Sequence, residues 1–289
     1  MPAPALGLTL GDPAGIGPEI VRAALASPDL PRTATLRVIG HVPPGTVPGR
    51  PTPASAAAAL TALEESVALL RSGAVAAVVT GPVCKENLQA AGFGFPGQTE
   101  FYAARFGVTD YAMILSGGGL TVSLATIHLP LREVPAALTP EAIVRAALHL
   151  LRLQERRLRR PARIAVAGLN PHAGEGGLFG DEEHRIIAPA LARLESDHPG
   201  RFSGPHAPDA VFRRALQGEF DGVVCMYHDQ GLIPLKLVGF DSGVNFTAGL
   251  PFVRTSPDHG TAFDIAGRGL ASPSSLIAAI RFAAELIVH

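Results

Sequence analysis

Three histidines lie in short polar segments, each shortly after an apolar run that is typical of a buried strand. They are His128, His172 and His228, and the preceding runs are residues 120–125, 164–167 and 223–226. A histidine just beyond a strand can face a cleft, and three neutral imidazoles around one open coordination position form a catalytic metal site. The alternative is that some of the ten histidines fall near strand ends by chance. The choice depends on whether the fold brings these segments to one place.

Further along the chain, polar side chains stand in an otherwise apolar stretch. Lys236, Asn245 and Arg254 supply donors that could together hold a phosphate or a carboxylate. The alternative is a set of ordinary surface groups. We favour a binding site because residues 232–238 and 244–253 look too apolar for an exposed face.

Glycine-rich turns differ in what they offer. Residues 170–177 combine an amide, an imidazole and a carboxylate with glycines that permit close backbone approach, which favours a functional loop. Residues 11–17 join a strand to a helix but lack a dinucleotide or phosphate-binding motif, which favours a tight turn over phosphate contact. The Asp–His pair in residues 258–262 fits a catalytic pair and a capped turn equally well.

The composition describes a globular protein with a sizeable core, since 47% of residues are hydrophobic and 17% are charged. A net charge of -1 offers no basic surface for nucleic acid or membrane. Two cysteines cannot form a disulfide framework, the N-terminus lacks signal-peptide features, and no apolar run is long enough to span a membrane. We therefore expect a soluble, cytoplasmic protein.

Lysine is rare in this chain. Lys85 and Lys236 are the only lysines among 24 Lys and Arg residues. A compact ammonium differs from the planar guanidinium that is the default cation here, so both lysines are predicted to mark functional positions. The alternative is that two lysines survive a strong bias towards arginine by accident.

Strand and helix signals alternate along most of the chain. Strands are predicted at 6–10, 35–39, 74–79, 112–115, 120–125, 164–167 and 223–226, and helices from 18 and at 54–70, 140–159, 183–194 and 273–288. This alternation predicts an α/β fold, with a largely parallel sheet covered on both faces and a hairpin at residues 112–125. The arginines near the end of the third of these helices are expected to be solvated: Arg156, Arg157, Arg159 and Arg160.

Motifs over the whole chain resemble those of the 4-hydroxythreonine-4-phosphate dehydrogenase family, NAD-dependent enzymes of pyridoxal phosphate biosynthesis. The matching segments are residues 11–19, 80–82, 170–177, 227–231, 243–245, 249–256 and 258–262. The resemblance implies two α/β/α domains with a cleft between them, similar to isocitrate and isopropylmalate dehydrogenases. We expect residues 1–125 with 255–289 to form one domain and 126–254 the other.

The resemblance also assigns site residues. By position, the metal ligands fall on His128, His172 and His228, with zinc, magnesium or cobalt as the ion; the substrate-binding residues fall on Gln98, Thr99, Lys236, Asn245 and Arg254. The family forms homodimers with shared active sites, which implies that one subunit supplies His228 and its partner supplies the other two ligands. Gln98 stands where the family commonly has histidine. It can still donate to a phosphate oxygen but carries no charge, so phosphate affinity or its pH dependence is expected to differ.

The implied reaction oxidises 4-phosphooxy-threonine at C3 with NAD or NADP, and the 3-oxo acid then loses carbon dioxide to give 3-amino-2-oxopropyl phosphate. The general base is not identified; Asp209, Lys85 and Asp229 are candidates in that order. A related dehydrogenase of 4-phospho-D-threonate or erythronate stays open. So do a metal-dependent hydrolase and, from another class, a ligand-binding protein without turnover.

Overall fold

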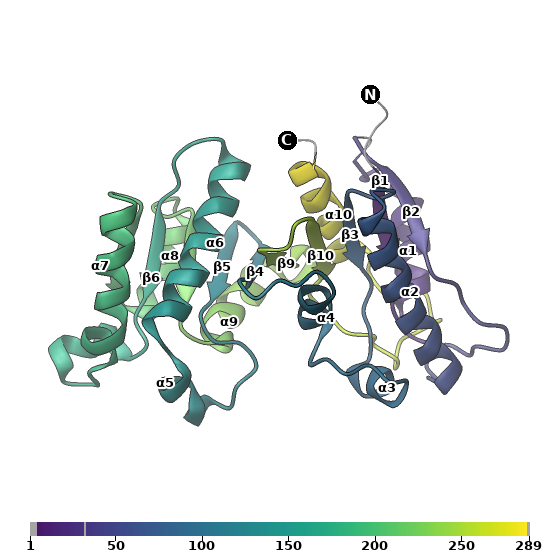
Figure 1. The fold of residues 1–289 in the computed structure, drawn as a ribbon, viewed down its shortest axis with the longest axis horizontal. Coiled ribbons are helices and arrows are strands. Elements are labelled where there is room, and N and C mark those ends of the chain that lie inside the picture. The colour runs from purple at the N-terminus through teal and green to yellow at the C-terminus, as the bar shows by residue number, and fades with distance from the viewer. Residues whose placement is uncertain (1–4, 32, 288–289) are drawn as a thin grey trace. The chain divides into compact units, whose positions relative to one another are not determined.

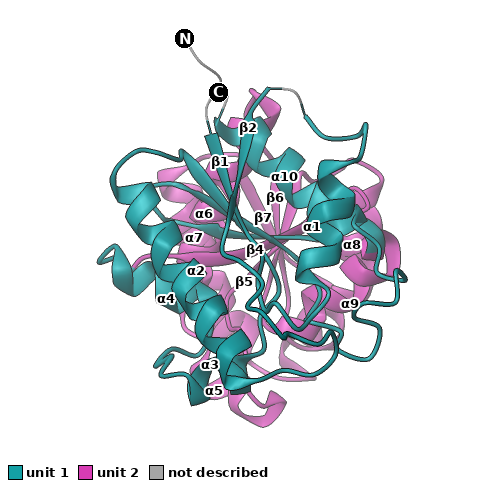
Figure 2. Ribbon diagram, turned by 90° about the vertical axis from the view of Figure 1, so that its right-hand side faces the viewer, with its two compact units in different colours: residues 1–109, 241–289 teal, residues 110–240 magenta. Residues whose placement is uncertain are grey.

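Residues 5–31 and 33–287 are described by a computed structural model, in which the chain divides into two units. Unit 1 is drawn from residues 1–109 and 241–289, and unit 2 from residues 110–240 (Figure 2). The domains expected from the sequence also have one domain built from both ends of the chain and the other from its middle. The expected boundaries, near residues 125 and 254, lie later in the chain than those of the two units. The first four residues of the N-terminal segment and residue 288 of the predicted last helix lie outside the described residues.

Unit 1 contains five strands in the order β2-β1-β3-β10-β9, in which β9 runs antiparallel to β10. Helices α1 and α10 pack together on one face, and α2, α3 and α4 form an apolar core with the other. The strands are β1 Ala5–Thr9, β2 Thr35–Ile39, β3 Ala77–Thr80, β9 Val244–Ala248 and β10 Val253–Pro257. The helices are α1 Gly17–Leu25, α2 Pro53–Arg71, α3 Lys85–Ala90, α4 Gln98–Arg105 and α10 Ser274–Ile287.

Unit 2 has the strand order β4-β5-β8-β6-β7; β4 and β5 form the predicted antiparallel hairpin and the other pairs are parallel (Figure 1). Helices α6 and α7 cover one face, and α8 and α9 cover the other. The strands are β4 Ala112–Gly117, β5 Leu120–Leu124, β6 Ile164–Ala167, β7 Phe202–His206 and β8 Gly222–Cys225. The longer helices are α6 Pro140–Leu158, α7 Ala188–Asp197, α8 Pro208–Leu216 and α9 His228–Gly239. Short helical segments are η1 Leu131–Glu133, α5 Val134–Ala137, η2 Pro171–Gly177, η3 Glu183–Ile187 and, at the junction with unit 1, η4 Phe240–Ser242.

Local sequence explains the ends of several elements. The Thr52 side chain accepts a hydrogen bond from the Ser55 amide while Ser55 caps Thr52 in return, so α2 begins at a reciprocal capping box. The turn at residues 11–17 is tightly closed, because a Cβ on Gly17 would lie 1.9 Å from the Leu10 carbonyl oxygen. This close packing agrees with the tight turn predicted there.

The expectation that residues 232–238 are too apolar for an exposed face was wrong for part of the segment, although Leu232 and Leu235 are buried. On α9, Ile233 is 67% exposed and Leu237 is 84% exposed. Val238, at 40%, and Phe240, at 72%, continue this apolar surface. The sequence shows that these side chains are apolar, but it does not show that the fold of a single chain leaves them exposed.

Among the described residues, no single helix is long and apolar enough to span a membrane. By length and composition alone, one pair bent by 94° passes the same test, Leu131–Ala137 with Pro140–Leu158.

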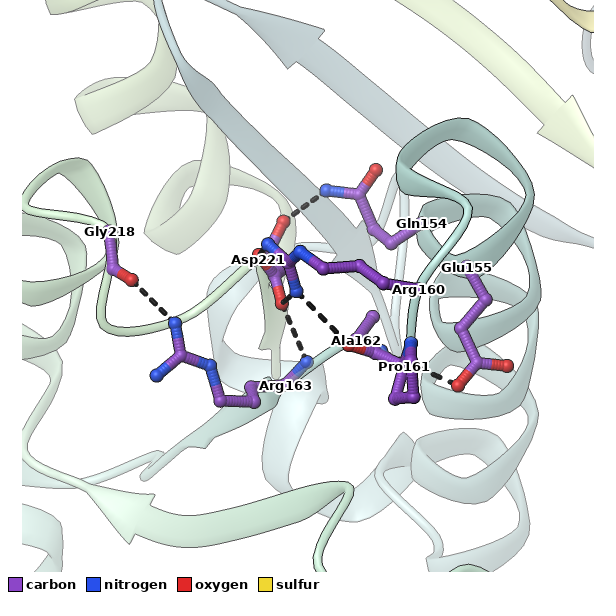
Figure 3. Close-up of polar contacts among 8 residues, drawn as sticks. All are labelled: Gln154, Glu155, Arg160, Pro161, Ala162, Arg163, Gly218 and Asp221. Atoms are coloured by element: carbon purple, nitrogen blue, oxygen red, sulfur yellow. Dashed lines mark hydrogen bonds and ion pairs between the residues drawn. The ribbon is translucent and has the colours of Figure 1, made fainter.

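The arginine cluster at the end of α6 is only partly the solvated helix end that the sequence predicted. Arg160 donates to both carboxylate oxygens of Asp221, at 3.0 and 2.6 Å, and the Arg163 amide donates to the same carboxylate at 2.8 Å (Figure 3). The Asp221 side chain is 9% exposed. Burial by itself raises the pKa of Asp221, but the hydrogen bonds from Arg160 and Arg163 outweigh it and hold the pKa below its ordinary value.

Replacement Asp221→Asn is therefore expected to lower the free energy of unfolding at pH 7 by about 1–3 kcal/mol, the size of hydrogen bonds to a buried charged group. Because the folded-state pKa is depressed, this contribution is present above the ordinary pKa of 3.8 and is lost as the pH falls through the folded-state value. Urea unfolding of both proteins from pH 7 to pH 3 measures it. Glu219→Gln, which removes an exposed pair with Arg214, is the control and should cost less. A stability difference that stays constant with pH would contradict the prediction.

Candidate functional site

A buried guanidinium is the central polar feature of unit 1. Arg254 is 3% exposed and donates from one terminal nitrogen to Thr247 and Thr99, at 3.1 and 3.4 Å. Its other terminal nitrogen donates to the Thr80 hydroxyl at 2.7 Å and to the Gln98 amide oxygen at 3.2 Å. None of these partners carries a negative charge, and the buried Nε has no hydrogen-bond partner among the described residues.

Strand register explains how these residues meet. Arg254 on β10 pairs with Val78 on β3, and it stands opposite Thr247 in the antiparallel register with β9. Paired residues of neighbouring strands point to the same face of a sheet, as do residues two apart on one strand. Thr80 and Asn245 therefore share this face with Arg254. The Asn245 side-chain oxygen is a buried acceptor that no donor of residues 5–31 or 33–287 satisfies.

Helix α4 begins at the same place. Gln98 and Thr99 are its first two residues, and its N-cap residue Gly97 provides no side-chain cap. The first backbone N–H groups of a helix have no acceptor within the helix and carry the positive end of its dipole, which favours an anion. Lys85 also approaches this end, with Nζ 3.8 Å from the position a Cβ on Gly97 would take. Burial lowers the pKa of Arg254 to about 10, so the guanidinium stays charged at neutral pH.

In unit 2, the three histidine loops follow neighbouring parallel strands. His128 follows β5, His228 begins α9 after β8, and His172 lies in η2 after β6. Since the strand order is β5-β8-β6, their carboxyl ends lie at one edge, where α/β sheets commonly bind ligands. The fold thus brings the three segments to the same edge of unit 2.

Two of these histidines lie together. The ring centroids of His128 and His228 are 5.4 Å apart. Two imidazoles on one tetrahedral zinc, with Zn–N distances near 2.0–2.1 Å, place their centroids roughly 5 Å apart. The His228 Nδ1 is 2.7 Å from a carboxylate oxygen of Asp229, an arrangement that orients a metal-binding imidazole and leaves Nε2 for the ion. This spacing fits one chain as the source of both histidines, whereas the resemblance implied different subunits, and the assignment of ligands to subunits remains a prediction.

His172 stands apart from that pair. Its Nδ1 is 2.8 Å from the Glu175 carboxylate, and its side chain is 61% exposed. Residues 172–176 all have positive φ, between 44° and 82°, which is strained for every residue except glycine. Within the described residues, no group of three His, Cys, Asp or Glu side chains could hold a metal ion. One chain therefore gathers two of the three predicted ligands.

The candidate bases occupy different surroundings. The Asp229 carboxylate is 2.7 Å from His228 Nδ1, and its role as a base remains a prediction. Asp209 is exposed in the first turn of α8, and Lys85 is exposed at the start of α3 in unit 1. Lys236 lies on α9 eight residues after His228, so it is about 12 Å further along the helix. The roles of Asp209, Lys85 and Lys236 remain predictions.

Sequence reasoning missed Thr80 and Thr247, which bind the Arg254 guanidinium directly. Thr80 lies in the matching segment 80–82, but no local signal shows that either threonine contacts Arg254, because that contact depends on the register of β3, β10 and β9. A weak signal existed for Glu175, which lies three residues after His172 in the loop identified as functional.

Comparison with known proteins places the chain among dehydrogenases. The sequence pattern of the family described as "Pyridoxal phosphate biosynthetic protein PdxA" matches residues 19–283. A 4-hydroxythreonine-4-phosphate dehydrogenase of Desulfosudis oleivorans is 44% identical, over 98% of this chain and 96% of that protein. The crystal structure of a 4-hydroxythreonine-4-phosphate dehydrogenase from Klebsiella pneumoniae is 40% identical, with a TM-score of 0.83 over 98% of this chain and 99% of that one.

A more distant structure bears on the fold alone. Isocitrate dehydrogenase from Methylococcus capsulatus is 20% identical, with a TM-score of 0.57 over 98% of this chain and 86% of that one. The predicted α/β fold of the isocitrate dehydrogenase type is confirmed. The family pattern and the similarity over the whole chain confirm the resemblance found in the sequence, and the chain belongs to the PdxA family of pyridoxal phosphate biosynthetic proteins.

Proposed function

We propose that this protein oxidises 4-phosphooxy-threonine with NAD or NADP, giving a 3-oxo acid that loses carbon dioxide to form 3-amino-2-oxopropyl phosphate. Membership of a family of dehydrogenases supports oxidation as the reaction class. The surroundings of Arg254 support a phosphorylated substrate. A buried charge whose hydrogen-bond partners are all neutral is costly, and an anionic ligand would offset that cost.

The substrate phosphate would lie at the N-terminus of α4. Arg254 supplies charge there, its Nε supplies an unused donor, and the first amides of α4 supply others. Gln98 accepts from Arg254 and donates one N–H to the Gly81 carbonyl at 3.2 Å. It therefore braces the guanidinium, and its second N–H is the donor that would contact the phosphate. Thr99 and Asn245 complete the set in unit 1, while Lys236 is a further proposed substrate contact.

The histidines fit a divalent ion that prefers nitrogen donors. His128 and His228 are spaced for one ion, and His172 and His228 each have Nδ1 bonded to a carboxylate. Imidazole donors favour zinc or cobalt over magnesium, which prefers oxygen. A bound ion would polarise the C3 hydroxyl and so assist loss of its proton.

A nucleotide fits a second feature of unit 1. His259 Nδ1 is 3.1 Å from the Gly260 carbonyl oxygen and donates to it, which leaves Nε2 as an acceptor; that atom is buried without a partner. An amino group of an adenine would satisfy this acceptor. The Ile16 amide donates to the Thr261 carbonyl at 2.9 Å and fixes the two turns together. The nicotinamide of the bound nucleotide would accept the hydride from C3.

The chain's own groups then orient the substrate and move protons. Holding the non-reacting phosphate lets binding energy orient C3 towards the hydride acceptor. A base takes the hydroxyl proton as the C3 hydrogen leaves as hydride, and Asp209 is the first candidate. The bond between C2 and the carboxylate carbon then breaks, carbon dioxide leaves, and C2 takes up a proton.

We propose a cytoplasmic homodimer with shared metal sites. The pairing of His128 with His228 favours one chain as the source of both, with His172 supplied by the partner subunit. The exposed apolar surface of α9, formed by Ile233, Leu237 and Val238, is suited to burial in such an interface. No nucleic-acid or membrane partner is proposed.

An NAD reduction assay tests the function. We expect NADH or NADPH formation with 4-phosphooxy-threonine, and loss of activity after treatment with a chelator that zinc or cobalt reverses. The controls are 4-phospho-D-threonate and 4-phospho-D-erythronate. Faster turnover of either would favour the sugar-acid branch, which the Arg254 site would serve equally well. Phosphate release without nicotinamide reduction would indicate a metal-dependent hydrolase, and binding without turnover a silent ligand-binding protein.

A further inference from the structure

A buried amide in unit 2 links two of the histidine loops. Gln230 is 7% exposed and lies two residues after His228 on α9. Its side-chain oxygen accepts from the Met226 amide at 2.7 Å, and its side-chain nitrogen donates to the Gly168 carbonyl at 2.7 Å. Gly168 is the first residue after β6, where the loop that carries His172 begins. Both ends of one amide are therefore bonded to backbone groups of different loops.

The third loop is bonded to the same place. The Thr126 hydroxyl donates to the Met226 carbonyl at 2.7 Å, and the Thr126 amide donates to the same carbonyl at 3.2 Å. Thr126 is 6% exposed and precedes His128 by two residues. Met226 thus connects the His128 loop to Gln230, and Gln230 connects both to the His172 loop.

A buried carboxylate holds the far side of the His172 loop. Glu183 is 6% exposed, and one of its oxygens accepts from the amides of Leu169 and Asn170, at 2.7 Å each. Its other oxygen accepts from the Asn170 side chain at 3.0 Å. Strained left-handed backbone such as residues 172–176 persists only where the surrounding structure determines it fully. Glu183 and Gln230 restrain the start of this loop through their hydrogen bonds to residues 168–170.

We propose that Gln230 and Glu183 are positioning residues, which hold the loops of His172 and His228 in the arrangement needed for the ion. This inference rests on the proposed function, in which these histidines bind a metal. Neither side chain needs to touch the ion or the substrate, since both are hydrogen-bonded to backbone groups of the histidine loops. They act by limiting how far the two imidazoles can move.

Gln230→Glu tests the proposal, because it keeps the side-chain shape and removes the donor to the Gly168 carbonyl. Gln154→Glu is a matched control. Gln154 is 5% exposed in the same unit, and its side chain donates to the backbone carbonyl of Asp221, which lies outside the histidine loops (Figure 3). Both changes place a carboxyl group against a backbone carbonyl, so both should lower the melting temperature.

Two readouts separate positioning from general stability. Amide hydrogen exchange of residues 169–177 is measured in the metal-free protein, and cobalt is titrated by its visible absorption. We expect Gln230→Glu to accelerate exchange in that loop and to weaken cobalt binding by about 10- to 100-fold, the usual effect of losing an outer-shell partner. Gln154→Glu should change neither.

Equal exchange rates and equal cobalt affinity in the two variants would overturn the proposal. Glu183→Gln provides a second route if Gln230→Glu does not fold; it retains an acceptor but loses the charge that receives two amides. Its control is Glu182→Gln, which likewise keeps an acceptor and loses the charge, but at a side chain that accepts only the 2.7 Å bond from the Asn170 side chain. A wild-type protein that binds no cobalt would refute the proposed metal site, whereas the exchange comparison would still decide whether the loop is held in this way.

Discussion

Replacement of Arg254 by lysine is expected to reduce kcat/KM by about 30- to 1,000-fold, although the charge is kept. Lysine cannot reproduce a planar fork that reaches two threonines from one nitrogen and Thr80 and Gln98 from the other. The lost hydrogen bonds and the buried acceptors left unsatisfied cost roughly 2–4 kcal/mol. The expected loss in kcat/KM follows because each tenfold change corresponds to about 1.4 kcal/mol. Steady-state kinetics with 4-phosphooxy-threonine measures the effect.

Competition by inorganic phosphate shows whether the loss lies in anion binding. Phosphate should inhibit the wild-type enzyme competitively and inhibit Arg254→Lys much more weakly. Arg268→Lys, at an exposed position of the same unit, is the control. It should change neither kcat/KM nor the inhibition constant of phosphate. If Arg254→Lys kept normal kinetics and normal phosphate inhibition, the guanidinium would be a structural group and the proposed phosphate site would be wrong.

Single replacements of His128, His172 or His228 by alanine are each expected to abolish turnover and reduce bound metal, because two ligands remain where three are needed. Pairwise mixing of the inactive variants then shows which chain supplies which ligand. If one chain supplies His128 and His228, mixing His172→Ala with either other variant restores activity, since each heterodimer has one intact site. About a quarter of all sites should recover in an equal mixture after random exchange.

The third mixture distinguishes the two arrangements. His128→Ala with His228→Ala should stay inactive, because no combination of these chains contains an intact pair. The division implied by family resemblance, with His228 alone on one subunit, predicts activity from this mixture and none from His128→Ala with His172→Ala. Subunit exchange must be confirmed separately, for example by mass spectrometry of tagged chains. If no mixture were active, all three ligands would come from one chain and the shared site would be excluded.

The sequence determined which chemistry is present and roughly where each element lies. The strands at 35–39 and 164–167 and the hairpin near residue 118 were predicted because runs of apolar residues and paired glycines are local signals. The order of parallel strands was not predictable, since a crossover places strands 40 or more residues apart side by side, as β5 and β8 are. The same limit hid β9 and β10, whose inward residues include Asn245 and Arg254 rather than a continuous apolar face.

Tertiary structure decided what each polar group does. The register of β9, β10 and β3 surrounds Arg254 with hydroxyl groups, and no spacing along the chain encodes that environment. Three histidine segments were recognisable by residue type, but only the strand order brings them to one edge, and only the folded chain places the ring of His128 beside that of His228. Residue identity is local, whereas burial and partners arise from contacts between segments distant in sequence. For that reason the sequence named the candidate ligands, and the fold decided which of them meet within one chain.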